Sequence, residues 1–181
     1  MLPSEGNFSR TAMEGISLRK AVLEDLEVLL GFEQELIKAE RPFDSTIRED
    51  PVSYYSIKDF ILDPEVELIV AEHQGRIVSS GYAKEKEARS YLDHDTYAYL
   101  GFMYTVPEFR GKGINRQIIS ALTEWATSKG LREVRLTVYP GNIPAVRAYE
   151  KVGFESILLE MRISDEHRSV KSDQAKKETK L

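Results

Sequence analysis

The most constraining part of this sequence is a stretch in which an apolar segment, a glycine-rich turn, an amphipathic segment and a second apolar segment follow one another. Tyr97 to Val106 is apolar at both alternating sets of positions, which is typical of a strand covered on both faces. Gly113 to Lys129 has apolar residues at helical spacing, and Val134 to Val138 again resembles a strand. This order predicts a βαβ unit, and therefore an α/β fold in which Tyr97 to Val106 is the central strand.

The flanking segments add further strands and helices to that unit. Gln74 and Gly75 form a tight turn between two apolar runs, Glu67–Ala71 and Arg76–Ser79, which predicts a hairpin. The other predicted elements are a strand at Ile16–Lys20, a helix from Val22 to about Glu40 that Pro42 ends, a helix at Ser53–Leu62, a helix at Pro144–Lys151, and a last strand or pair of strands at Phe154–Ile163.

The length of 181 residues suits one domain, and 41% hydrophobic with 30% charged residues is typical of a globular chain. We expect this domain to span residues 14–163, between a flexible leader at 1–13 and a disordered polar tail at 164–181. No apolar run is long enough to cross a bilayer, and the first residues do not resemble an export signal. A cytoplasmic protein is therefore expected.

Cysteine, histidine and charge limit the chemistry. The chain contains no cysteine, which excludes disulfide scaffolds, thiolate metal sites and a cysteine nucleophile. Its histidines, His73, His94 and His167, do not have the spacing of metal ligands, so no metal is expected. The net charge of −5 argues against a nucleic-acid partner and favours a cationic small substrate.

The turn between the predicted central strand and its helix is suited to bind an anion. Gly111 and Gly113 let the backbone approach a ligand, and the first amides of the next helix have no helical partner. Arg110, Lys112 and Arg116 add positive charge. Neither a Walker A loop nor a dinucleotide fingerprint fits, because glycine follows Lys112 and a third glycine is missing. A phosphorylated ligand is favoured, and the alternative is a turn that merely connects strand and helix.

Two segments together resemble the signatures of the GCN5-related N-acetyltransferases. Arg110, Gly113 and Asn115 stand at the three positions of the acetyl-CoA motif R/Q-x-x-G-x-G/A, where Asn115 replaces the usual Gly or Ala. The stretch 142–154 resembles the second signature, N-x-x-A-x-x-x-Y-x-K-x-G-F. The resemblance covers about Ile16 to Ile163. It implies a mixed α/β sheet of about six to seven strands, splayed at its centre, with helices on both faces.

The resemblance also implies a role for each matching residue. The end of the central strand would line the pantetheine arm, the turn amides would bind the pyrophosphate, and one asparagine would hydrogen-bond the ligand. These cofactor-binding residues are Met103, Tyr104, Thr105, Val106, Arg110, Gly111, Lys112, Gly113, Ile114, Asn115 and Asn142. Asn142 has an alternative or additional role as the cap of the following helix. Tyr149 would be the catalytic acid for the departing thiolate, and its alternative is a packed aromatic.

The base that accepts the proton of the amine is not identified by a motif. Relatives often carry a carboxylate at the start of the central strand, where this chain has Leu100, Gly101 and Phe102. The candidate replacements are Glu33, Glu40, Asp44, Asp93, His94 and Asp95. A chain of waters is an equal alternative. Because the segment 40–62 is acidic and aromatic, we expect it to form the wall of the acceptor site, suited to an amine next to an apolar group.

We therefore predict an N-acetyltransferase that moves an acetyl group from acetyl-CoA directly to the primary amine of a small molecule or amino-acid-like acceptor. Direct transfer is expected because the chain has neither a cysteine nor a G-x-S-x-G nucleophile. Acetyl-CoA and the amine would be its partners, without nucleic acid or membrane, and the chain is also a candidate for a homodimer. The alternative is an acyl-CoA-binding or sensing module with little turnover, motivated by the missing strand carboxylate and by Asn115.

Overall fold

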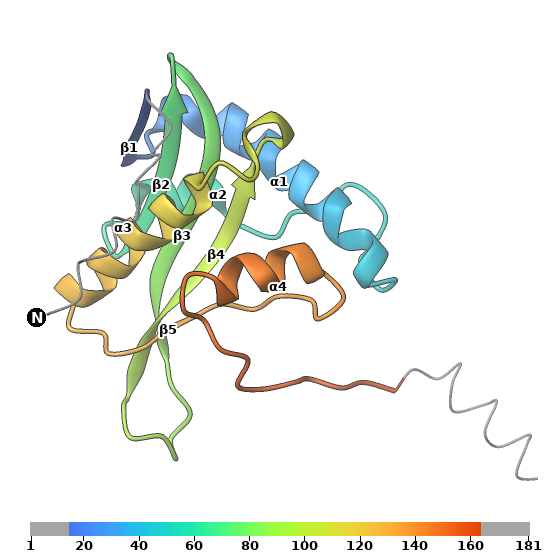
Figure 1. Cartoon of the computed structure of the whole chain (residues 1–181), viewed down its shortest axis with the longest axis vertical. Helices are drawn as coiled ribbons and strands as arrows, with labels where there is room; N and C mark the ends of the chain where they lie inside the picture. The colour runs from blue at the N-terminus through green and yellow to red at the C-terminus, as the bar shows by residue number, and fades with distance from the viewer. Residues whose placement is uncertain (1–14, 164–181) are drawn as a thin grey trace, which may run out of the picture. The chain divides into compact units, whose positions relative to one another are not determined.

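The computed structural model describes residues 15–163 (Figure 1). The chain divides into two compact units, 1–146 and 147–181, and the first of them contains all the strands of the sheet. The leader predicted at 1–13 and the tail predicted at 164–181 lie outside the described residues. These two segments, and a single domain over 14–163, therefore stay predictions.

The described part of the chain contains five strands and four α-helices. The strands are β1 (Ile16–Lys20), β2 (Val66–His73), β3 (Arg76–Glu87), β4 (Thr96–Thr105) and β5 (Val134–Arg135). The helices are α1 (Leu26–Glu40), α2 (Ile57–Leu62), α3 (Ile114–Ser128) and α4 (Ile143–Glu150). Short 3-10 helices lie at Leu23–Asp25, Arg41–Phe43 and Pro107–Phe109. The predicted first strand, hairpin, βαβ unit and helix after Pro144 are confirmed, with changes at their ends.

The sheet has the order β1-β2-β3-β4-β5, with antiparallel pairs up to β4 and a parallel pair between β4 and β5. The mixed sheet was predicted, but the number of strands is five among the described residues, not six to seven. The difference lies at residues 154–163, which join none of the ladders of this sheet. A strand requires a hydrogen-bonded neighbour, and apolar composition alone does not supply one. The predicted strand or pair of strands at Phe154–Ile163 is therefore wrong.

β3, and not β4, is the middle strand of the sheet. Strands that follow one another in the chain commonly pair, and β3 lies between β2 on one edge and β4 on the other. Its residues 78–83 are all buried, whereas buried and half-buried residues alternate along β4. The prediction of Tyr97 to Val106 as the central strand, covered on both faces, is corrected in this respect.

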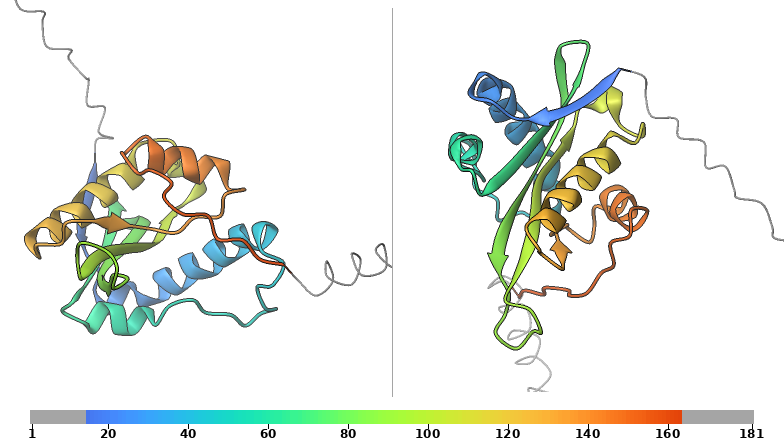
Figure 2. Two further views of the ribbon diagram at one scale, coloured as in Figure 1. Left: turned by 90° about the horizontal axis from the view of Figure 1, so that it is seen from below. Right: turned by 90° about the vertical axis from the view of Figure 1, so that its left-hand side faces the viewer.

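Helices cover both faces of the sheet. Figure 2 shows α1 and α2 on one face and α3 on the other. The apolar stripe of α3 is buried against the strands through Ile114, Ile118 and Leu122, as its helical spacing predicts. α1 buries Leu29 and Ile37 on the opposite side. None of the helices in the described range is long and apolar enough to cross a membrane.

Two predicted elements are shorter than expected. β5 contains only Val134–Arg135, and the predicted strand to Val138 ends early because the chain leaves β4 there. The helix predicted at Ser53–Leu62 begins only at Ile57. Upstream of Ile57, backbone N–H groups bind the buried carboxylate of Glu33, and these contacts hold the segment away from the helical path.

Gly101→Ala tests how closely β4 packs against the layer of aromatic side chains below it. A Cβ atom at Gly101 would lie 2.7 Å from the ring and the hydroxyl of Tyr82, which packs against Tyr55 and Phe60. Because this ring cannot move freely, we expect a loss of about 1–3 kcal/mol in the free energy of unfolding. That corresponds to a decrease in Tm of roughly 2–4 °C per kcal/mol.

The matched control is Gly31→Ala on α1, where nothing lies within 4 Å of the added Cβ. Alanine favours the helix, so the stability of this variant should be unchanged or slightly higher. Thermal unfolding followed by circular dichroism measures both. Equal melting temperatures for the two variants would contradict the packing described for Gly101.

Candidate active site

β4 contains a bulge at Phe102. The φ of Phe102 is 54°, in the left-handed region that bulky residues rarely adopt, and the pairing with β3 shifts by one residue at this point. One extra residue reverses the alternation of side chains, so Tyr99 and Phe102 point to the same face although they are three residues apart. Both belong to a set of contacting rings, which we call the aromatic cluster: Tyr55, Phe60, Tyr82, Tyr99 and Phe102.

Beyond the bulge, β4 is paired along one edge only. β5 pairs with β4 at Ala98 and Tyr99, after which the two strands separate. Among residues 15–163, no strand pairs with this edge of β4 from Leu100 to Thr105. The sheet is therefore open at the edge of β4 that leads to the glycine turn.

The bulge also decides which backbone groups face the open edge. The N–H of Val106 donates to the carbonyl of Val78 on β3, at 3.0 Å. Backbone groups alternate between the two edges of a strand, so the N–H groups of Met103 and Thr105 point away from β3. These two N–H groups are oriented to donate to a ligand that lies along the open edge.

Two buried serines of β3 hold the backbone of β4 in this arrangement. The Ser79 hydroxyl donates to the carbonyl of Tyr104 at 2.6 Å and lies 2.8 Å from the Thr105 hydroxyl. The Ser80 hydroxyl donates to the carbonyl of Phe102 at 3.1 Å. Sequence analysis missed both residues. The sequence did contain a signal for them, namely two adjacent polar residues in an otherwise apolar strand. Buried hydroxyls need hydrogen-bond partners, so such a pair indicates contacts with a neighbouring strand.

The glycine turn follows β4 directly. Gly111 and Gly113 have φ values of 73° and 79°, which are ordinary for glycine and strained for other residues. The hydrogen bond from the N–H of Gln117 to the carbonyl of Gly113, at 3.3 Å, begins the ladder of α3. The amides of residues 114–116 therefore have no carbonyl acceptor within the helix. Together with the helix dipole, they form the anion-binding geometry that the sequence predicts.

The cationic side chains of the turn pack back onto β4 and the turn itself. Arg110 Nε donates to the carbonyl of Thr105 at 2.9 Å, and its guanidinium carbon lies 5.8 Å from the centre of the Tyr104 ring. Lys112 Nζ lies 4.8 Å from the centre of the Phe109 ring. Arg110 thus connects the turn to the end of the strand. The structure brings the predicted residues 103–106 and 110–115 together, and their role toward acetyl-CoA stays a prediction.

Asn142 immediately precedes α4. Its side-chain oxygen accepts from the N–H of Ala145 at 3.3 Å, so the predicted capping role is confirmed. Its predicted contact with the ligand stays a prediction.

Tyr149 lies on the same helix but in the second unit, where its ring is half-buried and 5.9 Å from that of Phe154. The assignment of Tyr149 as the acid also stays a prediction.

Three of the candidate bases are engaged in structural contacts. The carboxylate of Glu33 is buried and accepts from three donors in the segment before α2, the Ser53 hydroxyl and the N–H groups of Tyr54 and Tyr55. His94 lies between two carboxylates, with Nδ1 2.8 Å from Asp93 and Nε2 2.8 Å from Glu133. The contact with Glu133 connects the loop before β4 to the start of β5, at the end of β4 that is far from the glycine turn. Asp95 belongs to the same loop.

Glu40 and Asp44 lie beside aromatic hydroxyls at the end of α1. Burial raises the pKa of Glu40, and a hydrogen bond with Tyr54 partly opposes this shift. Burial and the nearby Glu40 charge raise the pKa of Tyr54 to about 12. The Tyr139 hydroxyl donates to Asp44 at 3.4 Å, and the Tyr139 ring stacks on Phe43. Acidic and aromatic groups thus meet between the end of α1 and the segment after β5, and the role of the segment 40–62 as an acceptor wall stays a prediction.

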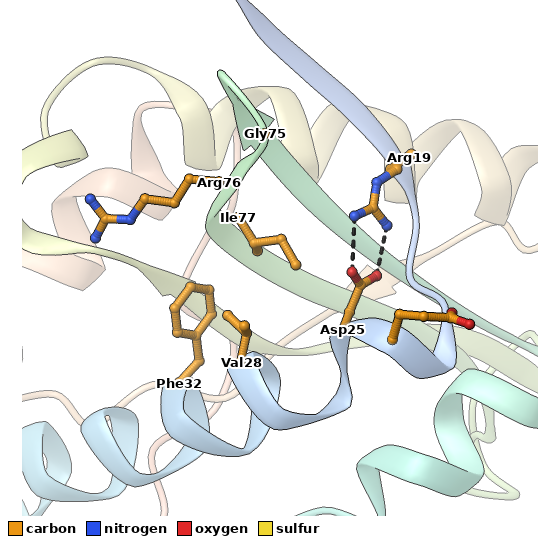
Figure 3. Close-up of a pocket in the computed structure, with 8 residues that line it drawn as sticks. Arg19, Asp25, Val28, Phe32, Gly75, Arg76 and Ile77 are labelled. Carbon is orange, nitrogen blue, oxygen red and sulfur yellow. Dashed lines mark hydrogen bonds and ion pairs between the residues drawn. The ribbon is translucent and has the colours of Figure 1, made fainter.

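A separate pocket of about 510 Å³ lies between α1 and the turn that joins β2 to β3 (Figure 3). In Figure 3, the side chains of Arg19 and Asp25, which help to line the pocket, point toward one another, and their closest atoms are 2.6 Å apart. The hydrogen bond with Arg19 is the main reason that the pKa of Asp25 is lowered. The apolar side of the pocket is formed by Phe32 and Val28. None of the predicted site residues lines this pocket.

The part of the chain that the structure describes contains no group of three or more histidine or acidic side chains placed to hold a metal ion. The groups that the candidate site offers to a ligand are backbone amides, aromatic rings and a few charged side chains.

Comparison with known families agrees with this geometry. The model of the Acetyltransferase (GNAT) family matches residues 33–154, so the chain belongs to this family, and the resemblance seen in its sequence is confirmed. The aminoglycoside N(6')-acetyltransferase type 1 of Salmonella typhimurium is 26% identical over 98 residues, which are 49% of this chain and 68% of the relative. The thialysine N-epsilon-acetyltransferase of Mus musculus is 37% identical over 59 residues, 33% and 35% of the two chains.

Other relatives match shorter parts of their length or only the fold. The uncharacterized N-acetyltransferase YobR of Bacillus subtilis is 41% identical over 63 residues, but this match covers 35% of the chain and 26% of YobR. The structure of aminoglycoside N-acetyltransferase AAC(6')-Iy in complex with CoA has a TM-score of 0.63 at 19% identity, covering 82% of this chain and 99% of that one. A predicted acetyltransferase from Clostridium acetobutylicum, solved with acetyl-CoA, has a TM-score of 0.63 at 18% identity, covering 82% and 96%.

Gly113→Val tests the glycine turn as the anion site. A β-branched residue at a φ of 79° is strained, and its side chain would block the approach of a ligand to the amides at the start of α3. Loss of two amide contacts corresponds to about 2–4 kcal/mol, so we expect affinity for acetyl-CoA to fall by roughly thirty- to a thousand-fold. Isothermal titration calorimetry measures the affinity.

Gly130→Val, at the opposite end of α3, is the matched control. Its φ is 75°, so the conformational strain is similar, but this end of the helix has no predicted contact with the ligand. The affinity of this variant should equal that of the parental protein. Equal affinity of the folded Gly113→Val variant would remove the turn from the site.

Proposed function

We propose that the protein is an N-acetyltransferase that transfers an acetyl group from acetyl-CoA directly to the primary amine of a small molecule or amino-acid-like acceptor. The observation that carries this proposal is the open edge of β4, which leads into the glycine turn and the N-terminus of α3. An extended arm can pair with such an edge, and a pyrophosphate suits the amides at its end. Membership of the GNAT family and the folds of CoA-bound relatives support the same ligand.

In this proposal, acetyl-CoA supplies the activated acetyl group and the chain supplies orientation and hydrogen bonds. The N–H of Met103, at the open edge, donates to the carbonyl oxygen as negative charge develops there. The amine forms the new C–N bond while the C–S bond breaks. The amine must lose a proton to a base or to water, and Tyr149 donates a hydrogen bond or a proton to the departing sulfur.

The acceptor is an amine next to an apolar group. Glu40 and Asp44 supply negative charge, and Phe43, Tyr54 and Tyr139 supply aromatic surface on the same wall. The names of two relatives, an aminoglycoside N(6')-acetyltransferase and a thialysine N-epsilon-acetyltransferase, support nitrogen as the accepting atom. Of the candidate bases, Glu40 fits best because burial raises its pKa toward the range in which a base works near neutral pH.

The second candidate function is an acyl-CoA-binding or sensing module with little turnover. It is favoured by the sequence of the bulge region, in which Leu100, Gly101 and Phe102 provide no carboxylate. A sensing module would bind the same ligand at the same turn, so binding does not separate the two functions. Release of free CoA separates them.

A thiol-release assay with a panel of amines tests the proposed function. The chain has no cysteine, so a thiol reagent reports only the CoA that is set free. We expect release that depends on one class of amine and saturates with its concentration, together with an acetylated product in mass spectrometry. Tight binding of acetyl-CoA without release for any amine would favour the sensing module.

Tyr149→Phe tests the assigned acid. An ordinary phenol, with a pKa near 10, is a weaker acid than a thiol near 8.5, so Tyr149 should act mainly by hydrogen-bonding the sulfur as its charge grows. We expect kcat to fall by roughly ten- to a thousand-fold, with little change in affinity for acetyl-CoA. Tyr91→Phe, which removes an exposed hydroxyl, is the control. A parental kcat under conditions in which chemistry limits the rate would show that Tyr149 is a packing residue.

A further inference from the structure

Two lysines of β3 lie over rings of the aromatic cluster. Lys84 and Lys86 are two residues apart, so their side chains project from the same face of the sheet as that of Tyr82. Lys86 Nζ lies 3.3 Å from the centre of the Tyr99 ring, and Lys84 Nζ lies 5.1 Å from that of Phe60, which belongs to α2. Both lysines are half-buried. The aromatic cluster therefore carries two positive charges on the face of the sheet that α2 covers.

Neither of these lysines has a carboxylate partner within residues 15–163. Lys20, Lys38 and Lys129 each form an ion pair with a glutamate, whereas Lys84 and Lys86 form none in this range. Burial and the nearby charge of Lys84 lower the pKa of Lys86. Two positive charges that share a partly buried surface are unfavourable without a counter-ion. A negative charge within reach of both ammonium groups would remove this cost.

The two lysines lie near the inner end of the open edge of β4. Tyr99 is the last residue of β4 that pairs with β5, and its hydroxyl lies 2.7 Å from that of Thr137, where the two strands have separated. Tyr99 and Met103 are four residues apart, which corresponds to roughly 10 Å along the strand when the bulge is allowed for. Viewed from the glycine turn, Lys86 therefore lies beyond the N–H of Met103. The far end of an acceptor would reach this place when its amine meets the acyl group.

The segment after β5 connects the lysines to the acidic side of the site. Thr137 contacts Tyr99, over which Lys86 lies. Two residues further along the chain, the Tyr139 hydroxyl donates to Asp44 at 3.4 Å. Positive and negative side chains thus lie at different places along one short segment. This separation of charge matches a ligand that carries an ammonium group and an anionic group at opposite ends.

We propose that the acceptor is an ω-amino acid, whose carboxylate binds to Lys86 and Lys84 while its amine is acetylated. This inference rests on the proposed function, because it names the substrate class of the same site. The carboxylate supplies the counter-ion that the two lysines lack, and the methylene groups of the acceptor can pack on the rings of the aromatic cluster. The same lysines repel an acceptor that carries a second ammonium group. Lys86 is thus a specificity-determining residue and takes no part in making or breaking bonds.

Matched acceptors test the proposal in the parental protein. The thiol-release assay compares ω-amino acids of increasing chain length with their primary amides, which keep the shape and remove the negative charge. We expect kcat/KM for the best ω-amino acid to exceed that for its amide by roughly ten- to a hundred-fold, the effect of one charge-assisted contact. A diamine of the same length should be worse than the amide. Equal values for acid and amide at every length overturn the proposal.

Variants of Lys86 assign this preference to the lysine. Lys86→Met keeps an unbranched side chain over the Tyr99 ring and removes the charge. Its kcat/KM for the ω-amino acid should fall by roughly ten- to a hundred-fold, mainly through KM, and that for the amide should stay parental. Lys86→Arg keeps the charge and should keep the preference. An equal loss with acid and amide in Lys86→Met would assign Lys86 to packing and overturn the proposal.

Lys129→Met is the matched control. Lys129 also lies over an aromatic ring, with Nζ 5.9 Å from the centre of the Trp125 ring at the end of α3, on the other face of the sheet. Its loss removes the same charge without touching the candidate site. The values of kcat/KM for the ω-amino acid and for the amide should both stay parental. A loss of preference in this variant equal to that in Lys86→Met would show an effect of net charge alone and overturn the role of Lys86.

A binding measurement without turnover separates this inference from the proposed function. The ring protons of Tyr99, followed by NMR during titration with the ω-amino acid, should shift in a saturable way that Lys86→Met weakens and that the amide does not reproduce. Acetylation of amines without any such response at Tyr99 overturns the inference and leaves the proposed function intact. Absence of thiol release with every amine counts against the proposed function. The titration then decides by itself whether the lysines bind a carboxylate.

Discussion

The left-handed backbone of Phe102 is the constraint on which the candidate site depends. At the start of β4, the N–H of Ala98 donates to the backbone carbonyl of Glu133, which directly precedes β5, and so points toward β5. In a regular strand, the N–H groups of all the even-numbered residues would point to this same edge. The N–H group of Met103 would then point to the other edge, toward β3. One inserted residue reverses this order. The donors of Met103 and Thr105 then face the edge where β5 has left the sheet.

The two sides of the site are built in different ways. On the side of the glycine turn, the end of β4, the turn and the start of α3 are consecutive in the chain, and the bond from Arg110 to the carbonyl of Thr105 spans only five residues. On the acceptor side, α1, the segment before α2 and the segment after β5 meet through contacts such as Tyr139 with Asp44, 95 residues apart. The geometry of the glycine turn is therefore local, whereas the proposed acceptor wall depends on the packing of the first unit.

Particular residues show how far sequence reasoning reaches. The geometry of the glycine turn could be predicted because Gly111, Gly113 and the following helical pattern determine the turn almost without tertiary contacts. The capping role of Asn142 was among the predicted alternatives for the same reason. Glu33 was treated as a candidate base because an acidic residue on a helix does not reveal what covers it. Its three donors, on Ser53, Tyr54 and Tyr55, lie 20 to 22 residues further along the chain, and only folding brings them together.

By itself, the sequence determined the order of strands and helices in the βαβ unit, the glycine turn before α3 and membership of the acetyltransferase family, because each depends on neighbouring residues and their periodicity. Only the tertiary structure decided that β3 is the middle strand, that the segment before α2 is not helical, and that β4 is bulged at Phe102. These features arise where residues distant in the chain satisfy each other's buried polar groups, as the Ser80 hydroxyl does for the carbonyl of Phe102. Periodicity records which residues are apolar, but it does not record which buried donor meets which acceptor.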